Sequence, residues 1–334
     1  MPGPTVSGAL RRFLPAFLAG RPPLAPARSR AVAAILGCRT EAMGGHVHAC
    51  PDCGATRFAW HSCNHKACPL CGRDATARWV EGGLRRLAGA PHFLVTFTLP
   101  AELRGLFHGP DQKQAIDLLF AAASGALADK LADQRWAGLA SSGFTAVLHT
   151  WNQRLGFHPH LHLIVPGAGP GRDGRVRRVK NANFLVPVPV LREAFRARFL
   201  EGMGKLGWGI DPGVRAKDWC VHVQPAGDGA AAVKYLGAYV ARGPMGDSRL
   251  VSVSHDTVTF RFKDRPNGGG WRNTTVTGVD FVGRWLLHVL PRGTRSIRYY
   301  GLHHASRRAE LERVRFHTGR TIVIGPPPGT ERPP

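Results

Sequence analysis

Two short cysteine knuckles constrain the fold of this chain more than any other feature of its sequence. Cys50-Pro-Asp-Cys53 and Cys68-Pro-Leu-Cys71 each place two thiols close together, and a glycine follows each pair. Two tight turns of this kind can present four sulfur atoms to one tetrahedral Zn²⁺, and the glycines permit the backbone angles of the turns. The spacing therefore predicts a zinc ribbon with Cys50, Cys53, Cys68 and Cys71 as structural ligands.

Further metal-binding side chains surround these knuckles. Cys63 and His65 lie between them, and three more histidines are close in sequence, namely His46, His48 and His61. These residues could hold a second zinc ion or replace a ligand of the first, and Cys63 could equally be a packed core thiol. Cys38 and Cys220 are isolated in sequence, and we expect them to be structural. The odd total of seven cysteines favours a metal site in a reducing compartment over a disulfide scaffold.

The chain is strongly basic. Its 334 residues include 45 Lys or Arg and 22 Asp or Glu, which gives a formal charge of +23. This excess excludes an enzyme with an acidic surface and indicates a polyanionic partner, with nucleic acid as the first choice. The apolar share of 43% argues against global disorder, and no apolar run is long enough to span a bilayer. We expect no membrane partner and no small-molecule substrate.

Hydrophobic periodicity and turn residues predict a mixed α+β chain. One or two helices, broken at Pro15 and at Pro22-Pro23, are expected in residues 1–36. Further helices are expected at 76–90, 101–109, 112–137, 189–205, from 230 onward, 278–290 and 301–313. Strands are expected at 92–99, 144–149, 158–165 and around 220–224, and a hairpin-like pair at 250–262 and 272–277.

A histidine-rich strand carries the strongest chemical signal. In Phe157-His-Pro-His-Leu-His-Leu-Ile-Val165, the residues His158, His160 and His162 recur with a period of two. Side chains alternate along a strand, so the three imidazoles are expected on one face. His160 and His162 can chelate one divalent ion, with His158 as the third ligand. A site with open coordination positions can polarise a phosphate oxygen.

Two of the four tyrosines, Tyr235 and Tyr239, are four residues apart in a segment that we expect to be helical. This spacing places both phenols on one helix face. A phenol has a pKa near 10 and is a poor nucleophile unless a cation assists it. It suits a mechanism in which a tyrosine ester stores the bond energy of cleaved DNA, although on spacing alone the pair can also be a packing or stacking face.

Taken together, these motifs resemble the two-tyrosine rolling-circle transposases of the HUH endonuclease superfamily, of the IS-ninety-one type. The resemblance covers about residues 35–315 in the order of the family. It is carried by the ribbon segments 44–53 and 62–71, by 95–100, by the histidine motif 158–162, by the tyrosine motif 233–240 and by 298–302.

The resemblance implies an N-terminal zinc ribbon followed by a catalytic domain with a central antiparallel sheet flanked by helices. It implies a helical arm at 1–36, a zinc-binding domain at 37–88, the catalytic domain at 89–318 and a flexible tail at 319–334. It places Mg²⁺ or Mn²⁺ on His160 and His162, and Tyr235 and Tyr239 as nucleophiles toward single-stranded DNA. A bacterial, cytoplasmic protein that works at the nucleoid is the corresponding expectation.

Two basic segments are expected to contact DNA. Residues 172–180 contain five cations and one acid, and residues 284–320 contain nine Arg and two Glu, too few acids for pairing within the chain. The predicted DNA-binding residues are Arg175, Arg177, Arg178, Lys180, Lys234, Arg295, Arg298, Arg307 and Arg308, and for Lys234 a solvated role is equally consistent. Two other functions remain open, a zinc-ribbon regulator without catalysis and a metal-dependent nuclease that uses water.

Overall fold

Alternating apolar side chains build the central sheet of the computed structural model, which describes residues 3–209, 211–217, 219–240, 243–264 and 267–320. Five antiparallel strands pair in the order β12–β4–β5–β3–β8. Their bounds are β3 His92–Thr98, β4 Phe144–Trp151, β5 Phe157–Pro166, β8 Cys220–Pro225 and β12 Ile297–Tyr300. The register places His149 opposite His160, and Thr96 opposite His162.

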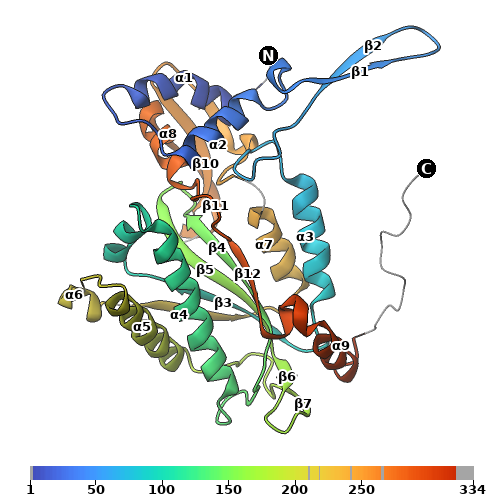
Figure 1. Cartoon of the computed structure of the whole chain (residues 1–334), viewed down its shortest axis with the longest axis vertical. Helices are drawn as coiled ribbons and strands as arrows, with labels where there is room; N and C mark the ends of the chain where they lie inside the picture. Colours follow the sequence, from blue (N-terminus) through green and yellow to red (C-terminus); the bar gives the residue numbers. More distant parts are fainter. Residues whose placement is uncertain (1–2, 210, 218, 241–242, 265–266, 321–334) are drawn as a thin grey trace.

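Helices cover both faces of this sheet (Figure 1). On one face, α4 (Gln112–Ala132) and α5 (Val188–Lys205) pack against a large core that includes Phe97, Leu161 and Phe195. On the other face, α3 (Arg73–Arg85) and α7 (Ala230–Val240) pack over a smaller core that includes Val147 and Ile164. Residues of β4 and β5 therefore alternate between the two cores, as expected for a sheet buried on both sides.

The N-terminal helices join a second lobe. α1 (Val6–Leu18) and α2 (Pro26–Gly37) share a hydrophobic core with α8 (Gly278–Leu287) and with a three-stranded sheet. The strands of that sheet are β9 Leu250–Val253, β10 Thr257–Asp264 and β11 Gly270–Thr277. The predicted break at Pro15 is wrong, because α1 continues through that residue. Packing of the apolar face of α1 on α8 compensates for the hydrogen bond that proline cannot make.

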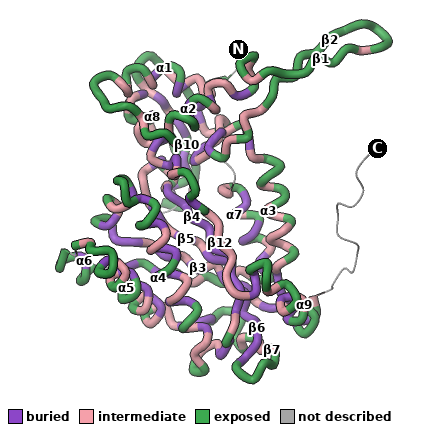
Figure 2. The backbone as a smooth tube through the Cα atoms, viewed as in Figure 1, coloured by how far each residue is buried: buried purple, intermediate pink, exposed green. Residues whose placement is uncertain are grey.

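The hairpin of β1 (Gly45–Ala49) and β2 (Thr56–Trp60) projects away from the body of the molecule (Figure 1). All ten residues of its two strands are exposed, as the tube in Figure 2 shows. Phe58 and Trp60 stack on each other with ring centroids 5.8 Å apart. This hairpin arm is thus stabilised by the hydrogen bonds between its two strands and not by burial in a hydrophobic core.

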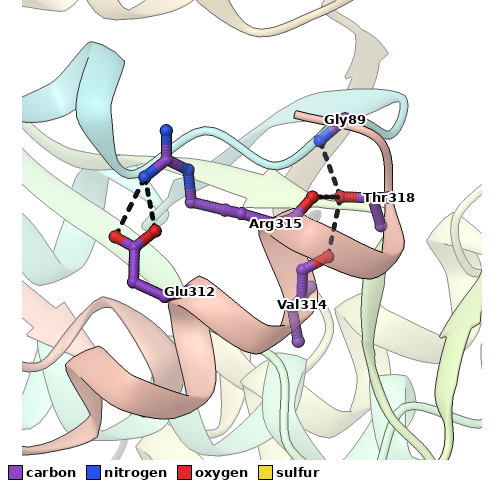
Figure 3. Close-up of polar contacts among 5 residues, drawn as sticks. All are labelled: Gly89, Glu312, Val314, Arg315 and Thr318. Carbon is purple, nitrogen blue, oxygen red and sulfur yellow. Dashed lines mark hydrogen bonds and ion pairs between the residues drawn. The ribbon is translucent and has the colours of Figure 1, made fainter. Parts of the chain in front are cut away.

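The C-terminal helix α9 (Arg308–His317) fastens the segment that leads into the central sheet. Thr318 Oγ1 accepts a hydrogen bond from the Gly89 amide at 2.9 Å and donates to the Val314 carbonyl at 2.8 Å (Figure 3). Nearby, Arg315 forms an ion pair with Glu312 at 2.7 Å. The C-terminal end of α9 is therefore tied to the loop that precedes β3.

Short elements complete the fold. They are the 3₁₀ turns Glu41–Met43, Ala101–Phe107, Asp247–Arg249, Gly301–His303 and Ala305–Arg307, the helix α6 (Pro212–Arg215), and the strands β6 (Ala168–Pro170) and β7 (Val176–Arg178). The continuous helix predicted at 301–313 is wrong: two 3₁₀ turns precede α9. Strand β12 was not predicted, because four residues carry too little periodicity to identify a strand.

The predicted α+β class, with a central antiparallel sheet flanked by helices, is confirmed. None of the helices in the described ranges has the length and apolarity needed to cross a membrane. The division into segments 1–36, 37–88 and 89–318 stays a prediction. Most of the tail predicted at 319–334 lies outside the described residues, which end at 320.

Candidate active site and zinc centre

Three histidines meet on the face of the central sheet that α7 covers. His149 comes from β4, and His160 and His162 come from the adjacent strand β5. One ring nitrogen of each lies within 4.8 Å of those of the other two. Three convergent imidazoles on two paired strands form a rigid set of ligands for one divalent ion.

Hydrogen bonds orient these rings for metal binding. His160 Nδ1 lies 2.6 Å from the carbonyl oxygen of His158, which can only accept, so Nδ1 carries the proton and Nε2 keeps its lone pair. His162 Nδ1 lies 2.9 Å from Thr96 Oγ1, and in the metal-binding tautomer it donates to that hydroxyl. His149 Nε2 is buried and has no hydrogen-bond partner among the described residues. The three residues therefore fit a metal ion bound through Nε2 atoms.

Burial favours the neutral form of two of these imidazoles. It lowers the pKa of His160 to about 4, against a smaller opposing effect of the hydrogen bond to the His158 carbonyl. Burial also lowers the pKa of His149 well below its usual value, with a further contribution from the other two rings. A neutral imidazole is the form that binds a metal ion, so His149 and His160 can each offer a lone pair to a cation at neutral pH.

His158 as the third ligand stays a prediction, and the structure groups His149, not His158, with His160 and His162. His158 contributes its backbone carbonyl to this site, as the acceptor for His160. Sequence reasoning did not single out His149, although it ends the predicted strand 144–149. Only the pairing of β4 with β5 places it opposite His160.

Tyr235 and Tyr239 face the histidine cluster from α7. The Tyr239 ring centroid lies 4.9 Å from that of His149, and the Tyr235 centroid lies 6.4 Å from that of His162. The two phenol rings are 5.3 Å apart, and both residues are half-buried. The predicted helix face is therefore turned toward the imidazoles and is not sealed in the core.

Two glycines bring the zinc-binding segment into contact with the tyrosine helix. A Cβ atom on Gly83 of α3 would lie 2.7 Å from Val233 Cγ1, and a Cβ atom on Gly237 would collide with Val80. Gly237 lies between the two tyrosines in sequence, so its missing side chain lets α3 pack closely behind them. The position of α7 over the sheet thus depends on this helix contact.

Four cysteines form a second cluster, at the junction of α2 and the loop before α3. The Sγ atoms of Cys38, Cys63, Cys68 and Cys71 all lie within 4.8 Å of one another. The distances from Cys71 Sγ are 3.5 Å to Cys38 Sγ and 3.7 Å to Cys63 Sγ. Thiolates around a tetrahedral zinc ion at about 2.3 Å are about 3.8 Å apart, so this cluster has the dimensions of a closed zinc site.

Of the predicted ligand set Cys50, Cys53, Cys68 and Cys71, the structure brings only Cys68 and Cys71 into this cluster. The first knuckle lies in the turn between β1 and β2, and strand β1 carries it away from the second. The other two members are Cys63, which the sequence analysis gave as an alternative ligand, and Cys38, which we expected to be structural. His65 is outside the group, and its Nδ1 accepts a hydrogen bond from the Ala67 amide at 3.1 Å.

Comparison with known proteins identifies the family. Residues 143–310 match a family described as "Putative transposase", and residues 9–99 match one described as "Transposase zinc-binding domain". A putative transposase of Sinorhizobium fredii, y4qJ, is 38% identical over 96% of this chain and 85% of its own length. The chain belongs to this transposase family. It is of the IS-ninety-one type, as the zinc-binding match and the resemblance in its motifs indicate.

Two further similarities are more distant. The transposase of insertion sequence element IS801 from Pseudomonas savastanoi pv. phaseolicola is 26% identical over 81% of this transposase and 68% of its own length. The conjugative relaxase TrwC, solved with oriT DNA in a metal-bound structure, matches 49% of this transposase and 67% of that chain, with a TM-score of 0.27 and 14% identity. The zinc-binding match and the four-thiol cluster together support Zn²⁺ as the structural ion of this enzyme, which acts on DNA.

The predicted DNA-binding cations fall into two groups in the transposase. Arg298 and Arg307 are engaged within the protein: Arg298 pairs with Asp117 and lies 4.0 Å over the Phe120 ring, and Arg307 pairs with Glu310. Arg177 is half-buried and donates hydrogen bonds to the side chains of Gln134 and Asp173. The others lie exposed on the surface, and they are Arg175, Arg178, Lys180, Lys234, Arg295 and Arg308.

Proposed function

We propose that this transposase cuts and rejoins single-stranded DNA through a phosphotyrosine intermediate, and so drives rolling-circle transposition. The observation that supports this most strongly is the position of the Tyr239 ring 4.9 Å from the ring of His149. A nucleophile and a set of cation ligands that share one half-buried site are what phosphoryl transfer requires.

His149, His160 and His162 would hold the divalent ion. When bound, a divalent cation supplies Lewis-acid stabilisation of charge on a phosphate oxygen. Nitrogen ligands suit Mn²⁺ better than Mg²⁺, which prefers oxygen, so of the two expected ions we favour Mn²⁺. The chain contributes the orientation of the rings, through the His158 carbonyl and the Thr96 hydroxyl.

The phenol oxygen of one tyrosine attacks the phosphorus atom of the scissile phosphodiester. A bond from that oxygen to phosphorus forms while the bond from phosphorus to the 3′ oxygen breaks. The products are a 5′-phosphotyrosine and a free 3′-OH, and the phenol proton lost is balanced by the proton that the 3′ oxygen gains. One ester replaces another, so the reverse reaction can rejoin DNA without a nucleotide cofactor.

The two tyrosines would divide this work. Their rings are 5.3 Å apart on one helix face, so both phenols lie near the same three imidazoles. While one tyrosine holds the first strand as an ester, the second can attack another strand. This arrangement allows two strands to be handled at one site, which strand transfer requires.

A denaturing gel tests this function. The protein is incubated with labelled single-stranded DNA and Mn²⁺ or Mg²⁺, and we expect a covalent protein–DNA band. The band should disappear in the Tyr235→Phe/Tyr239→Phe variant, which keeps both rings and removes only the hydroxyls. Free cut DNA without a covalent band would instead identify a hydrolase, and bound but intact DNA would identify a regulator.

A further inference from the structure

A cavity of about 580 Å³ lies next to the tyrosine site, where the second lobe meets the end of α7. Tyr239 and Trp151 belong to both places: they line the cavity, and their rings lie 4.9 Å and 5.6 Å from the ring of His149. The cavity therefore adjoins the site at which we propose that DNA is cut, and the two share Tyr239 and Trp151. Its volume is in the range of pockets that bind small organic groups.

The walls of this cavity combine aromatic rings with cations. Trp151 is half-buried and forms part of the cavity wall. Arg30, Lys66 and Arg292, which also line the cavity, contribute positive charge. Among the described residues, the lining contains neither Asp nor Glu. Aromatic faces beside positive charge are the chemistry with which proteins hold unpaired bases and their phosphates.

Three parts of the sequence meet in this wall. Ala27 and Arg30 come from α2, His65, Lys66 and Ala67 come from the cysteine-rich loop, and the remaining lining residues come from the catalytic region. The Lys66 ammonium group donates to the Thr294 carbonyl at 3.5 Å, which joins the loop to the segment after α8. The cavity therefore exists only when the zinc-binding region is docked on the catalytic region.

The cysteine cluster holds two of these parts in place. Cys38 follows α2 directly, and Cys63 and Cys68 flank the segment His65–Ala67. The Cys68 amide donates to the His65 carbonyl at 2.9 Å, inside the same turn. A zinc ion on the four thiols would thus fix both α2 and the loop that close the cavity.

We propose that this cavity binds one unpaired nucleobase of the DNA strand, next to the phosphate that is cut, with the base against Trp151 and its phosphates near Arg30 and Arg292. This inference rests on the proposed function, because it takes the substrate to be single-stranded DNA at the tyrosine site. A base must leave the duplex stack before it can enter a cavity of this size, so the cavity favours unpaired DNA.

Photo-crosslinking tests the inference. The probe is a single-stranded oligothymidylate in which one thymine is replaced by 5-iodouracil, irradiated with the full-length protein without added divalent metal. We expect a crosslinked peptide that contains Trp151, Tyr239 or His288, all of which line the cavity. Crosslinks that map only to other parts of the chain would overturn the inference.

A matched pair of variants on α2 separates the cavity from its surroundings. Ala27→Trp places a large side chain in the cavity and should lower the cavity crosslink about tenfold, the lower part of the range for loss of one stacked base. Ala33→Trp makes the same change on the exposed side of the same helix and should leave the crosslink unchanged. Equal crosslinking by the two variants would also overturn the inference.

The two proposals fail separately. A covalent tyrosine adduct together with crosslinks that avoid the cavity would leave the proposed function intact and remove the base-binding site. Cavity crosslinks in a protein that never forms the adduct would retain the base-binding site and remove the proposed chemistry. Zinc content and thermal unfolding of both variants verify that the fold is unchanged.

Discussion

The four-cysteine cluster and the three-histidine cluster differ in what they leave open. The cysteines supply four ligands, three of them buried, which completes the tetrahedral shell that zinc prefers. The histidines offer three possible ligands, two of them half-buried, with two phenol rings beside them. A closed shell holds parts of the chain together, whereas an open shell leaves room for a substrate oxygen. The cysteine cluster therefore suits a structural ion, and under the proposed function the histidine cluster suits a catalytic ion.

Loss of a thiol should have the largest effect. Cys38→Ser removes one of the four ligands, and we expect the protein to lose its zinc and to melt about 10 °C lower, since structural zinc contributes directly to folding free energy. Cys53→Ser is the matched control, because Cys53 lies exposed in the turn of the hairpin arm. Metal analysis and thermal unfolding measure both. If Cys38→Ser kept its zinc and Cys53→Ser lost it, the result would favour the ligand set that the cysteine spacing predicts.

Loss of an imidazole should leave the fold intact and stop the chemistry. We expect His149→Ala, like His160→Ala, to lower the rate of DNA cleavage about 10³-fold, because several kcal/mol of charge stabilisation depend on the ion. Zinc content should stay at the wild-type value. His158→Ala provides the control, since His158 lies outside the group of three imidazoles and the variant keeps the backbone carbonyl that accepts from His160, and we expect a change within about threefold. A His158→Ala variant as slow as His149→Ala would contradict the assignment of the third ligand.

Metal affinity should depend on pH differently in the cysteine cluster and in the histidine cluster. Burial raises the pKa of the Cys63 thiol to about 11, so at pH 7 the thiol must lose a proton before it binds zinc. Zinc affinity should therefore rise about tenfold per pH unit for each proton released. His160 has a pKa of about 4 and is already neutral at pH 7, so protonation of this residue should weaken Mn²⁺ binding only near pH 4.

Calorimetric titration in two buffers with different ionisation enthalpies counts the released protons directly. Zinc should release at least one proton at pH 7, and Mn²⁺ should release none from His149 or His160. Release of more than one proton on Mn²⁺ binding would show that at least one of these two imidazoles is charged in the metal-free protein, against the effect of its burial.

Substitution of Thr96, which contacts His162, should have a smaller effect on metal affinity. Thr96→Val keeps the shape of the side chain and removes the hydroxyl that lies 2.9 Å from His162 Nδ1. Partners of this kind orient a metal-binding ring, and their loss weakens metal affinity about 10-fold to 100-fold. Thr98→Val makes the same change two residues further along β3 and is the matched control. Mn²⁺-dependent cleavage curves measure the affinity, and an unchanged midpoint in Thr96→Val would exclude an orienting role.

The sequence was sufficient for the parts of the site that lie within one element. Strand alternation was enough to place His160 and His162 on the same face of their strand. Helical spacing was enough to place Tyr235 and Tyr239 on the same face of their helix. Both placements agree with the geometry of β5 and α7. Their catalytic roles stay predictions.

The expected ligands that the structure does not group together are those for which the neighbour lies in another element. His158 and His149 are both near His160, but one is two residues away in sequence and the other is opposite it across a strand pair. Cys50 and Cys53 form a regular knuckle, yet the hairpin arm carries them away from Cys68. Spacing along the chain reports local geometry, and it contains no information about which strand or loop becomes a neighbour.

The amino-acid sequence by itself determined the chemistry available to this transposase: its positive charge, its thiols, its paired imidazoles and its two phenols on one helix turn. Only the tertiary structure decided which of these groups meet. The pairing of β4 with β5 supplied the third histidine, and the return of α2 to the cysteine-rich loop supplied the fourth thiol. The physical reason is that covalent geometry fixes directions over a few residues, whereas contacts between distant segments depend on how the whole chain buries its apolar surface.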